Sequence, residues 1–436
     1  MSTVRTQNLK NACRALERST DRTSTWRPVF HLAPVTGWLN DPNGLCQIGD
    51  EYHVFYQYGP FDPTGGVKHW GHVRSRDLFH WERLPVMLYP DEPFDCHGVY
   101  SGSALVEDGM LYLYYTGNVK HPGEYDYIKQ GRGHNVCLAT SRDAIHLDNK
   151  RCLMYNQDYP AGLTCHVRDP KVLALDGRYY MVLGARTLDD HGEVLVFESA
   201  DKLHWNHINT ITTPKAFGYM WECPDLFPLR VEGSKEIKWV LLASVVNFTE
   251  TPDKLATATQ YFIGDFDGKH FTSEQTDTLW IDYGKDNYAG ITFDNAPDDR
   301  RIFVGWMHSH QYAAAAQGHT TQSWSGAATF PRELSIVRSA DGYRLKSKPV
   351  RELERLRGRS VKLKRQKINR TATLSDRIPF DKAPIELDLT FDGIDGPDAP
   401  SRYGIRLRND LGEYVSMEYD RKKRLFRVDR TQAAAV

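Results

Sequence analysis

Three carboxylates stand in short motifs whose residue types could do acid–base or nucleophilic chemistry. Asp41 lies in GWLNDPNGL, Asp169 in VRDPKV and Glu222 in MWECPDLF. Two carboxylates in one pocket can cleave a glycosidic bond, since one attacks carbon while the other protonates the leaving oxygen. Each motif alone has a simpler reading: a turn at Asp41, a surface ion pair of Arg168 with Asp169, or a buried Glu222 bonded to backbone. The chemistry depends on whether the fold brings the three acids together.

A repeated turn motif predicts that fold. SRDLFHW, SRDAIHL, SADKLHW and FDGKHF align on Asp77, Asp143, Asp201 and Asp267, which are 66, 58 and 66 residues apart, with His three residues after each Asp. ADGYRL at 340–345 is a looser fifth copy. A recurring period indicates a repeated supersecondary unit. We expect each Asp-x-x-His turn to be structural and to lie at the outer hairpin of its unit.

Short β-type runs separate these turns. They are EYHVFYQY (51–58), MLYLYYTG (110–117), GRYYMVLGA (177–185), KWVLLASVV (238–246) and RIFVGWM (301–307). Aromatic residues reach 12%, and 33 Gly and 22 Pro supply turns. Five such units without long helices predict an all-β fold, a five-bladed β-propeller.

The repeat also predicts where the acids lie. The innermost strand of a blade should precede the repeat's Asp by about 30 to 45 residues. Asp41 stands 36 residues before the repeat aspartate Asp77, Asp169 stands 32 before Asp201, and Glu222 stands 45 before Asp267. Ser101 occupies the matching place in the second blade. Innermost strands converge on the channel. The three acids should therefore point into one funnel.

Different surroundings should then give the acids different roles. Backbone N–H groups of Asn43 and Gly44 are expected to stabilise an anionic Asp41, which suits a nucleophile. Trp221 should desolvate Glu222 and raise its pKa, which suits an acid/base. Asp169, beside an arginine, should stay ionised and stabilise a positively charged transition state.

Composition narrows the partners and the compartment. Lys and Arg number 55 against 56 Asp and Glu, so we expect a neutral small-molecule partner, no nucleic acid and no membrane. Seven cysteines without a CxxC motif indicate neither a zinc site nor a disulfide framework. No signal peptide is visible at the N-terminus. A cytoplasmic protein is the expectation, and a homo-oligomer is left open.

Four segments are predicted along the chain. Residues 1–24 form a helical extension, in which Leu9, Ala12, Cys13 and Leu16 recur at helical spacing and the helix ends before Thr20. Residues 25–345 form the propeller and 346–365 a linker. In 366–436, alternating runs such as IELDLTF and YGIRLRN predict a β-sandwich module, partial because few residues remain for two sheets.

Taken together, the motifs resemble glycoside hydrolase family 32, the β-fructofuranosidases. The likeness covers residues 27 to about 340 and rests on RPVFHLAPVTGWLNDPNGL, FYQY, HWGH, YSGSA, RDPKV, WECPDLF and WSGAATFPRELS, in that order. That family comprises invertases, sucrose-6-phosphate hydrolases and exo-acting inulinases and levanases, with a five-bladed propeller followed by a β-sandwich. The resemblance implies retaining hydrolysis of terminal β-fructofuranosyl units from sucrose or short fructo-oligosaccharides, without metal or organic cofactor.

The resemblance also implies residue roles. Asp41 would be the nucleophile, Glu222 the acid/base and Asp169 the transition-state stabiliser. Substrate contacts would come from Asn40, Gln57, Tyr100, Ser101, Arg168 and Trp306. Independently of the resemblance, Trp70 is an aromatic residue near the motifs that can form the floor of a sugar site. The stretch at Thr64, Gly65 and Gly66 departs from the pattern, because many relatives carry there a Trp that walls the pocket. Lys68, Arg74 and Arg76 are candidate cations at the pocket mouth for a substrate that carries a phosphate.

Other functions stay open at this stage. A fructosyltransferase would use the same three acids, and a sucrose-6-phosphate hydrolase would add a phosphate. A propeller that only binds sugar would lack at least one acid, and all three are present. An inverting arabinan hydrolase is disfavoured by the WLNDPNG form of the first motif.

Overall fold

The computed structural model describes residues 4–23, 27–212, 218–247, 257–275, 277–307, 323–378, 384–394, 396 and 399–433. The chain divides into two compact units, Met1–Gly358 and Arg359–Val436. Each unit is described by itself below.

The described residues of the first unit form five antiparallel sheets. The first sheet contains β1 (Gly37–Ile48), β2 (Glu51–Gly59), β3 (His69–Ser75) and β4 (Glu82–Leu88), and the second contains β5 (Val99–Glu107), β6 (Met110–Lys120), β7 (Arg132–Ser141) and β8 (Asn149–Met154). The third sheet contains β9 (Leu163–Leu175), β10 (Arg178–Thr187), β11 (Gly192–Ser199) and β12 (Asn206–Ile211). The fourth contains β13 (Met220–Arg230), β14 (Ile237–Val246), β15 (Thr257–Phe266) and β16 (Phe271–Thr272), with β17 (Leu279–Trp280) beside β15, and the fifth contains β18 (Tyr288–Thr292), β19 (Arg301–Trp306), β21 (Arg332–Ser339) and β22 (Gly342–Pro349). Short 3₁₀ turns occupy Asn156–Asp158, Pro297–Asp299 and Arg351–Leu356. The predicted five-bladed propeller is confirmed.

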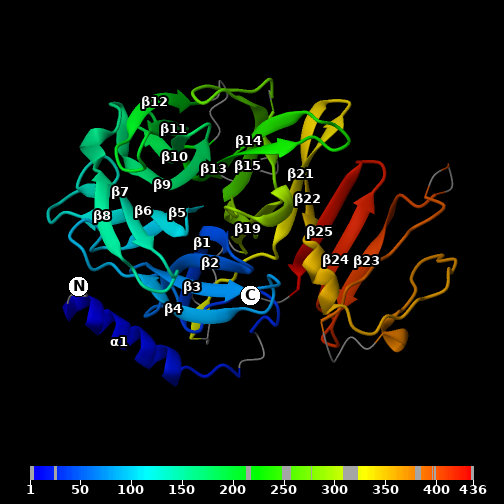
Figure 1. Ribbon diagram of the computed structural model, residues 1–436. Helices are drawn as coiled ribbons and strands as arrows, with labels where there is room; N and C mark the ends of the chain where they lie inside the picture. The colour runs from blue at the N-terminus through cyan, green and yellow to red at the C-terminus, as the bar shows by residue number, and fades with distance from the viewer. Residues whose placement is uncertain are drawn as a thin grey trace. The chain divides into compact units, whose positions relative to one another are not determined.

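The first strands of the blades form the inner wall of the ring. β1 contacts β5, β5 contacts β9, β9 contacts β13, β13 contacts β18, and β18 contacts β1. Figure 1 looks into this ring, with β4, β8 and β12 towards its rim. The strand β20 (Trp324–Ser325) runs parallel to β1 and pairs Gly37 with Trp324. A segment late in this unit therefore joins the first blade and closes the ring.

Apolar side chains fill the space between neighbouring blades. Phe55 and Trp70 of the first blade pack with Leu113 and Tyr115 of the second, and four further clusters of the same kind join the remaining pairs. Strands buried on both faces read as long apolar runs, which is why the sequence shows these strands so clearly. The interfaces hold the inner strands at fixed positions.

The repeated Asp-x-x-His motif makes the predicted outer hairpins. Asp201 lies between β11 and β12, and its Oδ1 accepts the backbone N–H groups of Leu203 and His204 at 2.9 Å each. Its Oδ2 contacts His204 Nδ1 at 2.7 Å. The same arrangement recurs at Asp77, Asp143 and Asp267. The looser copy at 340–345 forms the corresponding β21–β22 turn.

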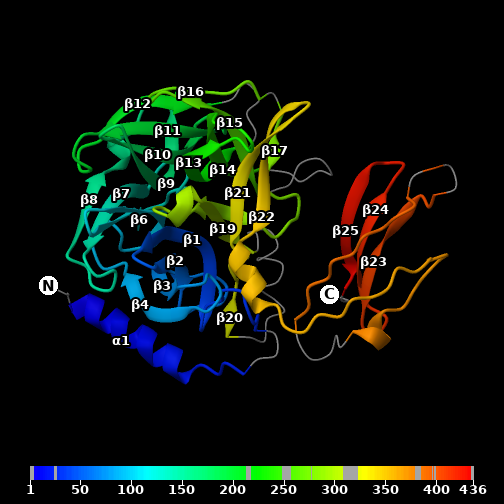
Figure 2. The same cartoon turned by 45° about the vertical axis from the view of Figure 1, so that its right-hand side comes forward.

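The N-terminal helix α1 (Val4–Ser19) lies beside the first blade (Figure 2). Its Cys13 is buried, Thr6 donates to Asp91 at 2.5 Å, and Tyr58 of β2 donates to Glu17 at 3.0 Å. The predicted helix and its end before Thr20 are confirmed.

The second unit contains one antiparallel sheet among its described residues. Its strands are β23 (Arg402–Arg408), β24 (Tyr414–Asp420) and β25 (Leu425–Gln432), with a short 3₁₀ turn at Ser375–Arg377. The run YGIRLRN falls on β23 as predicted. The expectation of a strand at IELDLTF is wrong, since residues 385–391 pair with no other strand in the described part of the chain. Alternation supplies a strand's pattern, but a strand needs a partner for its backbone groups.

Candidate active site

Each innermost strand is irregular where it pairs with the second strand of its blade. The register shifts lie at Leu39/Pro42 in β1, at Tyr100/Gly102 in β5, between Arg168 and Lys171 in β9, at Glu222/Asp225 in β13 and at Tyr288/Ile291 in β18. Asp169 has φ 67° and Cys223 has φ 44°, in the left-handed region. A bulge bends its strand and re-aims a side chain. All three predicted acids stand in or at the edge of such a bulge.

Asp41 is held by side chains from three places in the chain. Its carboxylate accepts from Asn40 Nδ2 at 2.9 Å, from Gln57 Nε2 at 3.3 Å and from Ser101 Oγ at 2.5 Å. Gln57 also contacts Ser101. All four residues are at most 9% exposed. The donors fix the direction of the carboxylate, and they place Asn40, Gln57 and Ser101 together as expected.

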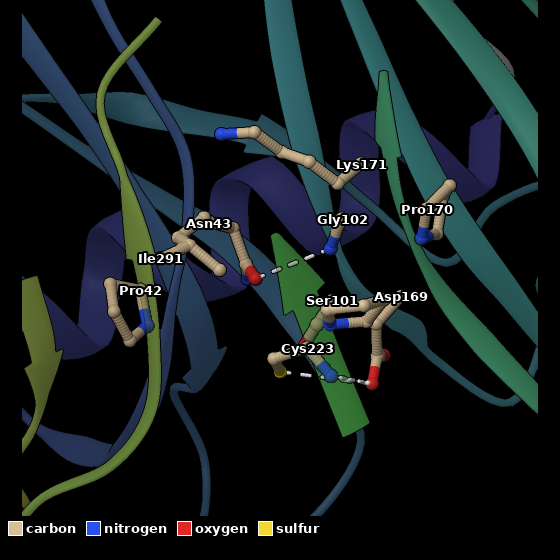
Figure 3. A pocket seen from close by; sticks show the side chains of 10 residues that line it. Pro42, Asn43, Ser101, Gly102, Asp169, Pro170, Lys171, Cys223 and Ile291 are labelled. Atoms are coloured by element: carbon tan, nitrogen blue, oxygen red, sulfur yellow. Dashed lines mark hydrogen bonds between the residues drawn. The ribbon is translucent and has the colours of Figure 1, made fainter. Parts of the chain in front are cut away.

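The expected backbone donors to Asp41 are not the ones used. Asn43 turns its side chain to the backbone N–H of Gly102, at 3.4 Å (Figure 3). Gly44 has φ 49° and lies against the rings of Phe55 and Trp70. The hydrogen bonds found for the Asp41 carboxylate come from side chains, which replace the predicted backbone groups.

Asp169 is buried and bonded on both sides. Its backbone N–H donates to Thr116 Oγ1 at 2.9 Å, and its Oδ2 accepts from the Cys223 N–H at 2.9 Å. Burial raises the pKa of Asp169 to about 7, against the opposing effect of Arg168. Desolvation outweighs the guanidinium, whose Nε lies 3.9 Å from Oδ2, so the ionisation expected of Asp169 depends on pH near neutrality.

Cys223 links two of the acids. Its Sγ lies 3.8 Å from Asp41 Oδ2 and 3.7 Å from Asp169 Oδ2. Figure 3 shows Cys223 and Asp169 facing each other, with Ser101 beside them. Carboxylates from β1 and β9 therefore flank one thiol on β13. These residues are 182 and 54 positions from Cys223 in the chain.

Glu222 precedes that thiol and has its own partners. Its Oε1 accepts from Arg168 Nη2 and its Oε2 accepts from the Tyr288 hydroxyl. The prediction that Trp221 desolvates Glu222 does not fit the position of the indole ring. Trp221 is fully buried and stacks on Phe262 at 5.9 Å between ring centroids, in the cluster between the third and fourth blades. Successive side chains of a strand point to opposite faces, so an arginine and a tyrosine surround Glu222 instead.

The predicted aromatic residues divide into two groups. Tyr100 is partly exposed, and its ring lies 5.6 Å from His134. Trp70 and Trp306 have no exposed surface, so the prediction that they contact substrate does not fit their positions. Trp70 donates its indole N–H to the Tyr100 carbonyl at 3.0 Å, and Trp306 packs edge-on against Trp38 at 5.5 Å. Both support the inner strands from behind because the blade interfaces enclose them.

Of the three candidate cations for the pocket mouth, Lys68 is the one that interacts with Asp41. Its Nζ lies over the Trp38 ring, 5.2 Å from the centroid. Among the described residues, no hydrogen-bond acceptor or ion-pair partner of this ammonium is found. Removal from water lowers the pKa of Lys68 to about 8, which Asp41 and Asp62 oppose. Arg74 instead pairs with Glu51 and Glu82.

Arg76 likewise pairs with Asp50 and Glu51.

Metal binding and membrane spanning find no support in the part of the chain that is described. No three His, Cys, Asp or Glu side chains there are grouped to hold a metal ion. No helix there combines the length and apolar character needed to cross a membrane.

Sequence reasoning missed Tyr288, which reaches Glu222 from the fifth blade. Counting back from the loose fifth repeat could not find it. That count places the innermost strand near RIFVGWM, whereas this run forms the second strand, β19, and residues 307–331 separate β19 from β21. The inserted length hides the true spacing.

Comparison with known proteins agrees with this geometry. The sequence profile of the Glycosyl hydrolases family 32 N-terminal domain matches residues 31–349, and that of the family 32 C-terminal domain matches residues 352–436. The chain belongs to glycoside hydrolase family 32. The expected resemblance is confirmed. The predicted fold class, a β-propeller followed by a β-sandwich module, is also confirmed. Of the sandwich module, the described residues form one three-stranded sheet.

Individual relatives bear the names of enzymes. The chain is 34% identical over 417 residues to a levanase of Bacillus subtilis, covering 94% of this chain and 59% of the levanase. It is 35% identical over 429 residues to a sucrose-6-phosphate hydrolase of Zymomonas mobilis, covering 94% and 78%. A raffinose invertase of Escherichia coli is 34% identical over 426 residues, with 95% and 83% covered.

Solved structures show the same fold. The sucrose-6-phosphate hydrolase of Lactobacillus gasseri superposes with a TM-score of 0.76 at 25% identity, covering 98% of this chain and 82% of that one. A family 32 β-fructofuranosidase of Bombyx mori gives 0.73 at 25% identity, covering 95% and 82%. The family 32 chain described here is therefore a glycoside hydrolase in fold and lineage.

Proposed function

We propose that this family 32 enzyme releases terminal non-reducing β-D-fructofuranosyl residues from sucrose and short fructo-oligosaccharides, with retention of configuration. One observation carries the proposal: Asp41 and Asp169 flank the Cys223 thiol at 3.8 and 3.7 Å, with Glu222 adjacent in the chain. Carboxylates gathered at one place are what glycoside hydrolysis requires. The names of the relatives, levanase, sucrose-6-phosphate hydrolase and raffinose invertase, support the substrate class.

In the first step, a carboxylate oxygen of Asp41 bonds to the anomeric carbon of the fructosyl unit while the glycosidic C–O bond breaks. Glu222 gives its proton to the departing oxygen. In the second step water attacks the anomeric carbon, Glu222 takes a proton from that water, and the ester to Asp41 breaks. The three donors to Asp41 suit this role because they fix the attacking group in direction.

Asp169 is assigned to the developing positive charge. An ionised carboxylate at this place stabilises an oxocarbenium-like transition state. Its hydrogen bond from the Cys223 backbone fixes it next to the reacting carbon. Its raised pKa makes its ionisation depend on pH near neutrality, which gives the role a measurable signature.

Recognition of the fructosyl unit is assigned to polar side chains around these acids. Asn40, Gln57, Ser101 and Arg168 each contact one of the three acids, and the partly exposed Tyr100 belongs to the same strand as Ser101. Trp70 and Trp306 serve as buried supports of the inner strands in this proposal.

Lys68 favours a second candidate, a substrate whose leaving group carries a phosphate. Its ammonium sits over Trp38 without a bonded partner among the described residues, which leaves its N–H donors available to an anion. Relatives 35% and 39% identical are named sucrose-6-phosphate hydrolase. The fructosyltransferase alternative gains nothing comparable from the relatives. A cytoplasmic location is also proposed, and the free thiols of all seven cysteines support it.

Initial rates on sucrose, sucrose 6-phosphate, kestose and inulin test these proposals side by side. Release of fructose from at least one of them, with loss of release in Asp41→Asn, is expected. No release from any would overturn the proposed function.

Lys68→Met separates the two candidates. If Lys68 binds phosphate, the variant loses roughly 10- to 100-fold in kcat/KM on sucrose 6-phosphate relative to sucrose, which corresponds to one charge-assisted hydrogen bond. The wild-type preference should also fade as pH rises through about 8, where the ammonium loses its charge. An unchanged ratio in the variant would remove the second candidate.

A further inference from the structure

Arg168 stands between two carboxylates and can serve only one of them well. Its Nη2 contacts Glu222 Oε1, and its Nε lies 3.9 Å from Asp169 Oδ2. Both acids belong to the proposed machinery, and a guanidinium favours the ionised form of the carboxylate that it touches. The orientation of Arg168 therefore decides how charge is shared between the two acids.

His166 holds the opposite side of that guanidinium. Its Nδ1 lies 2.7 Å from Arg168 Nη1, and its Nε2 lies 3.2 Å from the Tyr127 carbonyl oxygen. A guanidinium can only donate hydrogen bonds and a carbonyl can only accept them. Nδ1 must therefore accept from Arg168, and Nε2 must carry the proton that it donates to Tyr127. One neutral tautomer satisfies both contacts.

The surroundings keep the imidazole neutral. Burial, followed by the nearby charges of Arg168 and Arg132, lowers the pKa of His166 to about 3. The ring also packs edge-on against His134, with centroids 5.4 Å apart. Nδ1 therefore stays an acceptor with a fixed direction at pH values well above about 3.

The partner carbonyl belongs to a well-bonded loop. Asp126 Oδ1 accepts the backbone N–H groups of the three residues 128–130, and Cys165 of β9 donates its N–H to the Ile128 carbonyl at 2.7 Å. The loop between β6 and β7 therefore anchors an imidazole on β9, which in turn meets Arg168.

We propose that His166 is a positioning residue that turns the Arg168 guanidinium towards Glu222 and away from Asp169. Without the Nδ1 acceptor, Arg168 is free to rotate towards Asp169, whose carboxylate already lies close to Nε. Glu222 would then lose its contact with Arg168, and Asp169 would gain one. The consequence for activity rests on the proposed function, whereas the positioning itself does not.

Other charged or titratable groups face the same cluster and bear on any pH effect. They are Asp41 of β1, Tyr100 of β5, Arg132 and His134 of β7, Tyr219 next to β13, Cys223 of β13 and Tyr288 of β18. None of them is altered in the variants below, so shifts between variants report on His166.

Three variants test the proposal. His166→Phe removes both ring nitrogens. His166→Asn carries an amide near the place of Nδ1 and should keep Arg168 on Glu222. His166→Gln reaches towards the place of Nε2 and should leave Arg168 unsupported. Crystal structures of the three enzymes show directly which carboxylate the guanidinium contacts.

The expected result is that Arg168 contacts Glu222 in His166→Asn but moves towards Asp169 in His166→Phe and His166→Gln. Arg168 unmoved in His166→Phe would overturn the proposal, whatever the enzyme's substrate.

The pH profile of kcat/KM then tests the consequence. In His166→Phe the acidic limb should move to lower pH and the alkaline limb to higher pH, each by about one unit, because a cation shifts a neighbouring carboxyl by that order. His166→Asn should restore both limbs. A moved Arg168 with unmoved limbs would instead count against the roles proposed for Asp169 and Glu222. A uniform loss of activity with a wild-type profile would mean a merely structural His166.

Discussion

Arg168 contacts the carboxylate of Glu222, 54 residues further along the chain, and leaves its own neighbour Asp169 with only a 3.9 Å approach from Nε. Two acids that share one cation unequally acquire different protonation behaviour. A hydrolase that needs one proton donor and one stabilising anion requires such a difference.

The first prediction concerns the acidic limb of the pH profile of kcat/KM, where activity rises with pH. Burial raises the pKa of Asp169 to about 7, and its proposed role requires the ionised form. We therefore expect kcat/KM on sucrose to rise as pH increases through about 7. In Asp169→Asn the residual activity should lack this limb. An acidic limb of the same position in the variant would assign it to another group.

The same shift predicts how stability depends on pH. The folded pKa of Asp169 lies above its ordinary value of 3.8, so its protonated form stabilises the fold below about pH 4. This contribution disappears as pH rises through about 7. The amide of Asp169→Asn cannot ionise. The unfolding free energy of the variant minus that of wild type should therefore rise by about 1 to 3 kcal/mol when the pH is raised from about 5 to about 8.

Urea unfolding of both proteins at the two pH values measures this gain. Titrating groups far from Asp169 are common to both proteins and cancel in the comparison, so the difference reports on Asp169 and the groups coupled to it. A difference between variant and wild type that stays constant with pH would contradict the raised pKa.

Glu222→Gln should discriminate between leaving groups. A poor leaving group such as glucose needs the proton from Glu222, whereas an activated aryl alcohol leaves without it. On sucrose, we expect the rate of the first step, in which the fructosyl-enzyme forms, to fall by about 10²- to 10⁴-fold. On an activated aryl fructoside the same rate should fall far less. The pre-steady-state burst of released aryl alcohol measures this rate. Glu198→Gln, on β11 and paired with Arg178, is the control. Equal losses on both substrates would exclude Glu222 as the proton donor.

The outer hairpins should affect stability without affecting chemistry. Asp77 accepts the backbone N–H groups of Phe79 and His80 at 3.0 and 2.8 Å. Asp77→Ala should lower the unfolding free energy by about 1 to 3 kcal/mol and leave kcat unchanged. Asp77→Asn retains an acceptor and should cost less. A large fall in kcat at a temperature where the variant is folded would show that this turn influences the site.

Much of the fold was predictable because blades obey local rules. The Asp-x-x-His turns use a side chain to bond their own backbone, so their spacing reported the blade period and the place of Asp41, Asp169 and Glu222. The pattern failed where local rules stop. The strand expected at IELDLTF has no partner among the described residues, and alternation cannot supply one.

The surroundings of the acids were less predictable than their positions. Side-chain donors replaced the backbone groups of Asn43 and Gly44, and Trp221 faces a blade interface. In both cases a bulge, set by long-range pairing, decides where a side chain points. The burial that raises the pKa of Asp169 likewise arises from five converging strands, which no single motif encodes.

Trapping the covalent intermediate tests the central assignment most directly. In Glu222→Gln, an activated aryl fructoside needs no acid for the first step, while the second step lacks its base, so the fructosyl-enzyme should accumulate. Peptide mass spectrometry of the trapped protein should then find one fructosyl unit on the peptide that contains Asp41. A fructosyl unit on a peptide containing Asp169, or release of the aryl group with no labelled peptide, would contradict Asp41 as the nucleophile.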